Sequence, residues 1–137
     1  MSILDATLAA GRREAEARMR DTVRLYTQGE DVFDRESGQT APGPQSTLYQ
    51  GPARIKGVAQ SSGEDTQAGE RELVLREYEV AVPWATTLPQ GARLLPGARI
   101  EVLSSLDPRM AGLVLWVTGA KFADQATAWR ISVEDRS

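Results

Sequence analysis

The chain has 137 residues, enough for one domain with a hydrophobic core, and carries a formal net charge of −3 with a pI near 5.0. It contains no cysteine and no histidine, which excludes disulfides, thiol nucleophiles, imidazole acid–base catalysis and the common zinc sites. No apolar run is long enough to span a membrane, and the start lacks a signal-peptide pattern. We therefore expect an intracellular protein that makes no membrane contact.

Catalysis without imidazole or thiol groups would depend on carboxylates. The visible pairs are Glu64 with Asp65, Glu77 with Glu79, and Glu134 with Asp135. Glu77 and Glu79 lie on the same solvent-facing side of a predicted strand, where charged residues are common in any case. We predict that the chain is not an enzyme and that it has no metal site and no cofactor.

Residues 1–20 have the pattern of an amphipathic helix. Ser2 and Asp5 have the character of a capping box at its start. Its apolar stripe is narrow and rich in small residues, so the helix needs a surface to lie against, either its own domain or a neighbouring subunit. The candidate docking residues of this helix are Leu4, Leu8, Arg12, Arg13 and Met19.

From residue 21 onward, alternating apolar and polar residues indicate strands. Strands are predicted near 21–27, 46–56, 72–82, 98–103, 113–118 and 129–133. The second is expected to bulge or turn a corner at Gly51-Pro52, because proline lacks a donor. The stretch 113–118 is apolar on both faces, which is typical of a central strand.

Three long connections separate these strands, near 28–45, 57–71 and 84–97. The first contains a turn at residues 34–38, where Asp34 can accept from the backbone and Gly38 supplies a positive φ. The predicted fold is mainly β with an N-terminal helix over 1–20. A single domain over 21–137 follows, a small antiparallel barrel or sandwich of about five to seven strands with long loops.

Two further features bear on function. The loop 57–71 is polar and glycine-rich, which favours either a mobile gate or a plain surface excursion. Trp84, Trp116 and Trp129 are interpreted as core or interface residues, because a stacking platform for nucleic acid would call for a basic surface.

The order of several short motifs resembles the head-closure, or stopper, proteins and related head-to-tail connectors of tailed bacteriophages infecting actinobacteria. The resemblance covers nearly the whole chain and is carried by residues 2–5, 11–12, 34–38, 48–55, 105–108 and 126–130. Each motif alone is a turn or strand that many β proteins contain, so their order and spacing carry the resemblance.

The resemblance implies a ring of six or twelve copies in the neck of the virion, assembled in the host cytoplasm. Its partners would be the portal–adaptor ring, the tail terminator or tail tube, and double-stranded DNA held in the lumen without sequence-specific binding. A loop facing the lumen would retain the DNA until ejection. The candidate gating residues in the 57–71 loop are Gly57, Gly63, Glu64, Asp65, Gly69 and Glu70.

A ring also needs two different complementary patches on each subunit. The candidate inter-subunit charges are Arg24, Arg76, Glu77, Glu79, Glu101 and Arg130. Three alternatives remain open: another neck ring such as an adaptor or tail terminator, an acidic nucleic-acid-binding barrel, and an enzyme that uses carboxylates alone.

Overall fold

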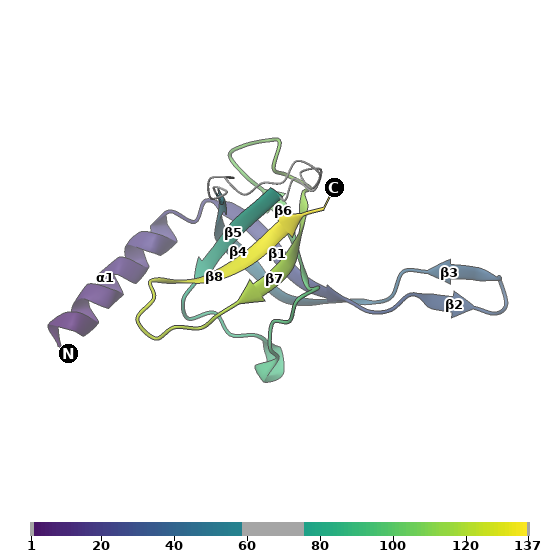
Figure 1. The fold of residues 1–137 in the computed structure, drawn as a ribbon, viewed down its shortest axis with the longest axis horizontal. Helices are drawn as coiled ribbons and strands as arrows, with labels where there is room; N and C mark the ends of the chain where they lie inside the picture. Colours follow the sequence, from purple (N-terminus) through teal and green to yellow (C-terminus); the bar gives the residue numbers. More distant parts are fainter. Residues whose placement is uncertain (1, 59–75, 137) are drawn as a thin grey trace, which may run out of the picture.

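The computed structural model describes residues 2–58 and 76–136 (Figure 1). The elements in chain order are α1 (Ile3–Ala17), β1 (Asp21–Gln28), β2 (Val32–Asp34), β3 (Gln39–Ala41), β4 (Gln45–Gly57), β5 (Arg76–Pro83), the short 3-10 helix η3 (Pro89–Gly91), β6 (Arg99–Ser104), β7 (Val114–Ala120) and β8 (Ala128–Asp135). The chain is therefore mainly β with one N-terminal helix, as the sequence predicts.

Six strands form a closed antiparallel barrel in the order β1-β4-β5-β8-β7-β6, and β1 closes it by pairing with both β4 and β6. The remaining strands, β2 and β3, pair with each other in a separate two-stranded hairpin. Figure 1 shows this hairpin projecting from one side of the barrel and α1 lying at the opposite side.

The barrel interior is filled by aliphatic side chains at alternate strand positions. The fully buried ones are Val23, Leu25, Val80, Val82, Ile100, Val102, Leu115, Val117, Ile131 and Val133. Each of five strands supplies two of them, because successive side chains on a strand point to opposite faces. In β1, β5, β6 and β8 the alternation in the sequence predicts these inward positions correctly. In β7 both faces are apolar, so the alternation does not show which face points inward.

The helix α1 begins with the predicted capping box: the Ser2 hydroxyl accepts from the Asp5 N–H, and the Asp5 side chain accepts from the Ser2 N–H. The helix ends at Ala17, three residues before the predicted end. No residue of the helix is fully buried, and Met19, which is buried, lies in the connection to β1.

The segment 28–45, predicted as a connection, contains the β2–β3 hairpin. The strand β4 runs unbroken through Gly51-Pro52, and its register shift against β1 falls at Leu48 instead. The pairing of β4 changes just after Gly51-Pro52, since β4 pairs with β1 up to Ala53 and with β5 from Arg54. The hydroxyl of Tyr49 donates to the Pro52 carbonyl at 2.6 Å.

The strand β7 is apolar on both faces, as the sequence indicates, but a single-layer barrel has no second sheet to cover its outer face. The outward Trp116 is covered by two guanidinium groups, those of Arg99 and Arg136, which lie 4.0 Å and 4.5 Å from its ring centroid. The outer face of β7 is therefore covered at Trp116 by arginine side chains, and not by a second layer of structure.

Replacing Leu115 with alanine should lower the free energy of unfolding by about 2–5 kcal/mol, because it removes a fully buried side chain from a closed core. Denaturant unfolding checks this. The matched control is Leu106→Ala, at a leucine that is 74% exposed, where a change within about 0.5 kcal/mol is expected. Equal effects at the two positions would contradict this description of the core.

Candidate docking and assembly surfaces

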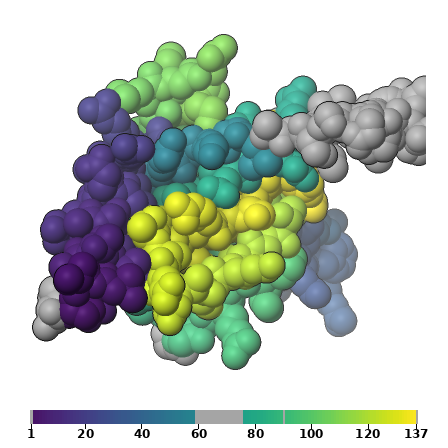
Figure 2. All heavy atoms as spheres, turned by 60° about the vertical axis from the view of Figure 1, so that its left-hand side comes forward, coloured from purple at the N-terminus to yellow at the C-terminus, as the bar shows by residue number. Residues whose placement is uncertain are grey.

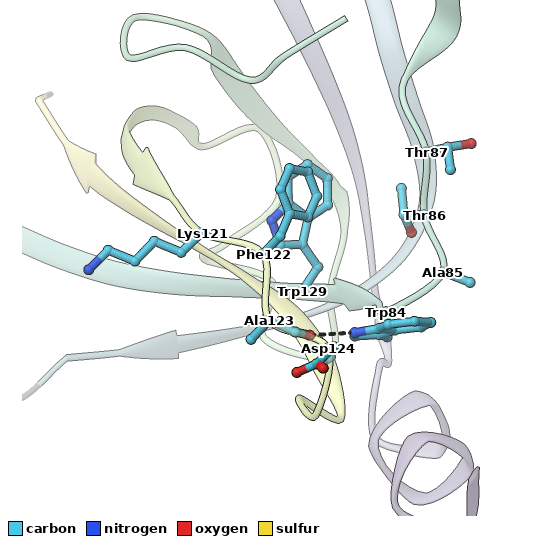
Figure 3. Close-up of a pocket in the computed structure, with 10 residues that line it drawn as sticks. Trp84, Ala85, Thr86, Thr87, Lys121, Phe122, Ala123, Asp124 and Trp129 are labelled. Carbon is cyan, nitrogen blue, oxygen red and sulfur yellow. Dashed lines mark hydrogen bonds between the residues drawn. The ribbon is translucent and has the colours of Figure 1, made fainter. Parts of the chain in front are cut away.

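Arg12 fastens α1 to its own barrel. Its Nε donates to the Ala126 carbonyl at 3.1 Å and its Nη2 to the Asp124 carbonyl at 2.7 Å, both in the β7–β8 loop. The guanidinium carbon lies 3.5 Å from the ring centroid of Trp84, which follows β5 directly. The Trp84 Nε1 in turn donates to the Ala123 carbonyl at 2.8 Å (Figure 3). One arginine therefore joins the helix, the end of β5 and the loop.

The helix approaches the barrel closely on this side. A Cβ at Gly11 would lie 2.9 Å from Cγ2 of Thr127, so glycine is the residue that permits the contact. Figure 2 shows α1, in purple, lying along the yellow-green β7–β8 segment. Farther along the chain, Ala15 and Met19 border a small cavity of about 80 Å³ together with Ala128 of the barrel.

The structure separates the candidate docking residues of the helix into two groups. Arg12 and Met19 contact the protein's own barrel, and Leu8 is half-buried. Leu4 and Arg13 are exposed, as is Ile3, which has 87% of its surface exposed. The helix therefore lies on its own barrel through its C-terminal half, while its first turn presents apolar side chains to the surroundings.

A pocket that we call the aromatic groove lies beside this contact (Figure 3). Its volume is about 510 Å³, and its lining is mostly apolar. Residues 84–87 form one wall, residues 121–124 form the other, and Trp129 of β8 lies between them. Phe122, which is 74% exposed, stacks on the buried Trp129 with ring centroids 4.9 Å apart and an interplanar angle of 17°.

The β2–β3 hairpin also exposes apolar residues. Val32 and Phe33 have 54% and 60% of their surface exposed, and every residue of both strands is exposed. The base of the hairpin is fixed: Gln28 Nε2 donates to the Gly43 carbonyl at 2.7 Å, and the Gly29 N–H donates to the Pro44 carbonyl at 2.8 Å. A Cβ at Gly43 would overlap the Gly29 and Glu30 carbonyl groups, so only glycine allows the two backbone segments at the base of the hairpin to lie this close.

The turn of the hairpin is built as the sequence predicts. Asp34 accepts from the Glu36 N–H at 2.9 Å and from the Ser37 hydroxyl at 3.1 Å, and Gly38 has φ 73°. These hydrogen bonds, led by the one from the Glu36 N–H, hold the pKa of the Asp34 carboxyl below its ordinary value. Residues 105–108, another of the motifs that resemble stopper proteins, also form a turn. There Asp107 accepts two hydrogen bonds from the Arg109 side chain, and these lower the pKa of the Asp107 carboxyl.

Most of the candidate inter-subunit charges have partners within the chain. Arg24 lies 3.6 Å from Glu101, Arg130 lies 3.5 Å from Glu79, and Arg76 lies 3.7 Å from Asp135. Glu77 is exposed on β5. Partly exposed pairs of this kind contribute little to stability, so these arginines and glutamates remain able to contact a neighbour as well.

Of the candidate gating residues, Gly57 ends β4 and is exposed. The others, Gly63, Glu64, Asp65, Gly69 and Glu70, lie outside the described residues.

Within residues 2–58 and 76–136, no three acidic side chains lie close enough together to hold a metal ion. No helix in these ranges is long and apolar enough to cross a membrane.

The faces of the three tryptophans are occupied by other side chains of the same protein. Arg12 lies over Trp84, Arg99 and Arg136 lie over Trp116, and Phe122 stacks on Trp129. Trp129 is in the core cluster and Trp84 is at the helix–barrel contact. This arrangement fits the core or interface interpretation better than a row of open rings for stacking bases.

Two exposed aromatic residues escaped the sequence analysis. Phe33 precedes the Asp34 turn, and Phe122 follows Lys121 at the end of β7. The available signal is the same in both cases: an aromatic side chain stands in a segment between predicted strands, outside the alternating pattern that marks the core.

The described residues form a closed barrel from which α1 and the β2–β3 hairpin extend. The chain belongs to a family of unknown function (DUF6093), whose model matches residues 11–134. No curated protein matches the sequence significantly. The fold is similar to the solution structure of protein SF1141 from Shigella flexneri 2a, with a TM-score of 0.51, 16% sequence identity and coverage of 88% of this chain and 95% of that one. At this identity the similarity concerns the fold alone.

Replacing Arg12 with glutamine should loosen α1 and lower the free energy of unfolding by about 1–3 kcal/mol, since it removes charge-assisted hydrogen bonds and a cation–π contact. Hydrogen exchange of the α1 amides should accelerate by a matching factor. The control is Arg13→Gln, one residue along and exposed, which should leave both quantities nearly unchanged. Identical behaviour of the two variants would show that Arg12 does not hold the helix.

The hairpin turn should weaken in acid. The folded-state pKa of Asp34 lies below the ordinary aspartate value of about 3.9, so its contribution is complete above that value and is lost as the pH falls through the lower folded-state pKa. The Glu36 amide resonance in a pH titration should therefore shift with a midpoint below about 3.9. In Asp34→Asn this shift should disappear. A midpoint at or above the ordinary value would contradict the hydrogen bonds described here.

Proposed function

We propose that this chain is a ring-forming structural subunit of the neck of a tailed bacteriophage, a stopper that joins the portal–adaptor ring to the tail. The observation that carries the proposal is the placement of its exposed apolar residues. Ile3 and Leu4 lie on the first turn of α1 at one side of the closed barrel, and Val32 and Phe33 lie on the β2–β3 hairpin at the other. The other large apolar residues that are exposed are spread over loops and strand ends. Exposed apolar residues gathered on projections are typical of interaction sites.

The closed barrel supports an assembly role of this type. Each of its six strands pairs with a strand on either side, so the barrel has no terminal strand that a partner could extend along its whole length. Contacts between subunits must then come from side chains, helix ends, loops and the hairpin. Projections on opposite sides give each subunit two different surfaces, which is what a head-to-tail ring requires.

The charge of the chain fits a conduit for DNA. At a net charge of −3 it has little tendency to neutralise phosphates, and a surface that binds phosphates weakly lets DNA slide past. The resemblance of the motif order to stopper proteins supports the same role. An adaptor or tail-terminator ring is the alternative within the neck, and the neighbouring protein distinguishes them.

The role is tested in a phage whose genome encodes this chain. Without the gene, filled heads should fail to join tails and should lose DNA. The tagged chain should bring down portal–adaptor proteins together with tail proteins, and cryo-electron microscopy of the neck should place it between them. Capture of tail-tube proteins alone would indicate a tail-completion ring. Normal virions without the gene product would contradict any neck role.

The gating loop is tested separately with a variant that lacks residues 58–70. Particles carrying it should still join tails but should leak DNA, because the ring would form without its closure. A polar glycine–serine segment of equal length serves as the matched control for loop length. Capsids that retain DNA with the shortened loop would rule out this loop as the gate and leave the ring itself unaffected.

A further inference from the structure

The hairpin and the aromatic groove lie on opposite sides of the barrel. Figure 1 places β2 and β3 on the side away from α1, and the groove adjoins the α1 contact through Trp84. Figure 2 agrees, with the hairpin behind the barrel when the α1 side comes forward. Two apolar features on opposite sides of one molecule can meet between two copies but not within one.

Within residues 2–58 and 76–136, β2 and β3 pair with each other and with no other strand. A two-stranded hairpin is at best marginally stable in water, and this one exposes all of its strand residues. Its base is nevertheless fixed by the Gln28 and Gly29 hydrogen bonds and by the close approach at Gly43. A projection held in one direction loses little conformational entropy when it docks, which favours binding.

The groove has room for an aromatic side chain and a wall that is incomplete. Its volume of about 510 Å³ lies in the range of ordinary ligand pockets. Phe122 leaves most of its surface open at the rim. The Trp129 indole N–H, buried at 3% residue exposure, has no hydrogen-bond partner among the described residues, which is unusual for a buried donor.

Charge complementarity favours a second copy as the occupant. Residues 29–44 contain four carboxylates and one arginine, a net charge of −3 for the hairpin and its base. Near the groove, Arg12 and Lys121 carry positive charge against the single carboxylate of Asp124. Arg12 meets its hydrogen-bond needs with carbonyl groups, which leave its charge unneutralised.

We propose that the β2–β3 hairpin of one subunit docks in the aromatic groove of a second copy of this chain, with Phe33 entering between Thr86 and Phe122. The contact is heterologous, so its repetition closes a ring when the rotation between neighbours permits it. The inference rests on the ring proposed above and names the surface through which the subunits would join. The strand pairing in the hairpin places Thr40 opposite Phe33 on the same face, and that face of the hairpin would contact the groove.

Disulfide crosslinking tests the contact directly, because the natural chain has no cysteine. A Thr40→Cys variant, which keeps Phe33 and carries its cysteine opposite it in the hairpin, is mixed with a Thr86→Cys variant at several hundred micromolar and oxidised. The heterodimer should form several-fold faster than with Leu106→Cys, a matched control at an exposed leucine in the β6–β7 loop. Equal rates for the two mixtures would overturn the proposal.

A second measurement avoids the added cysteines. Phe33→Ala and Phe122→Ala should each weaken self-association about tenfold to thirtyfold in sedimentation, as truncation of a central aromatic anchor does. Circular dichroism should show the barrel intact. Val32→Ala, on the other face of the hairpin, is the matched control and should change association little. Dissociation unaffected by Phe33→Ala, or an oligomer lost equally with Val32→Ala, would contradict the docking.

The two proposals fail in different ways. If neck rings contain the chain but position 40 does not crosslink to position 86 preferentially, the ring stands and this contact is wrong. If the crosslink forms but the chain is absent from particle necks, the contact stands and the neck role is wrong. Preferential crosslinking of Thr40→Cys to another neck protein, and not to a second copy, would also overturn the self-docking.

Discussion

The pairing of β1 with both β4 and β6 is the constraint on which the rest of the structure depends. It closes the sheet into a barrel and encloses the aliphatic core. Everything outside this barrel must therefore attach to its outer surface or project from it. The helix does the first through Arg12, and the β2–β3 hairpin does the second.

The outer surface shows how such attachments are made without a second hydrophobic layer. Guanidinium groups lie on the rings of Trp84 and Trp116, and carbonyl groups of the β7–β8 loop accept from Arg12. Arginine suits this work because its planar fork donates several hydrogen bonds while its face stacks on an aromatic ring. Arginine outnumbers lysine in this chain, and at these positions its side chains both stack on tryptophan rings and donate hydrogen bonds to carbonyl groups.

Strand interiors could be predicted because alternation is local: Val80 with Val82 and Ile131 with Val133 identify the inward face from neighbouring residues alone. The turn at Asp34 was also local. The hairpin around it was not, since its strands are three residues long and bury nothing. The contacts of Arg12 join residues more than a hundred positions apart in the sequence, and a periodic pattern of apolar residues carries no information about contacts over such a separation. The groove is lined by Trp84 in one loop and Phe122 in another, and the two loops are brought together by the closed barrel.

The one-sided fastening of α1 has a mechanical consequence. The capping box stiffens the helix at Ser2, and the close contact with the barrel begins at Gly11, so the turns between them act as a lever. Eight residues separate Ile3 from Gly11, which puts Ile3 about 12 Å beyond the pivot. A tilt of about ten degrees there would carry the exposed Ile3 and Leu4 through about 2 Å, with the rise per residue fixing the arm. The first turn of α1 could therefore follow a small movement of a protein bound to it while the barrel keeps its position.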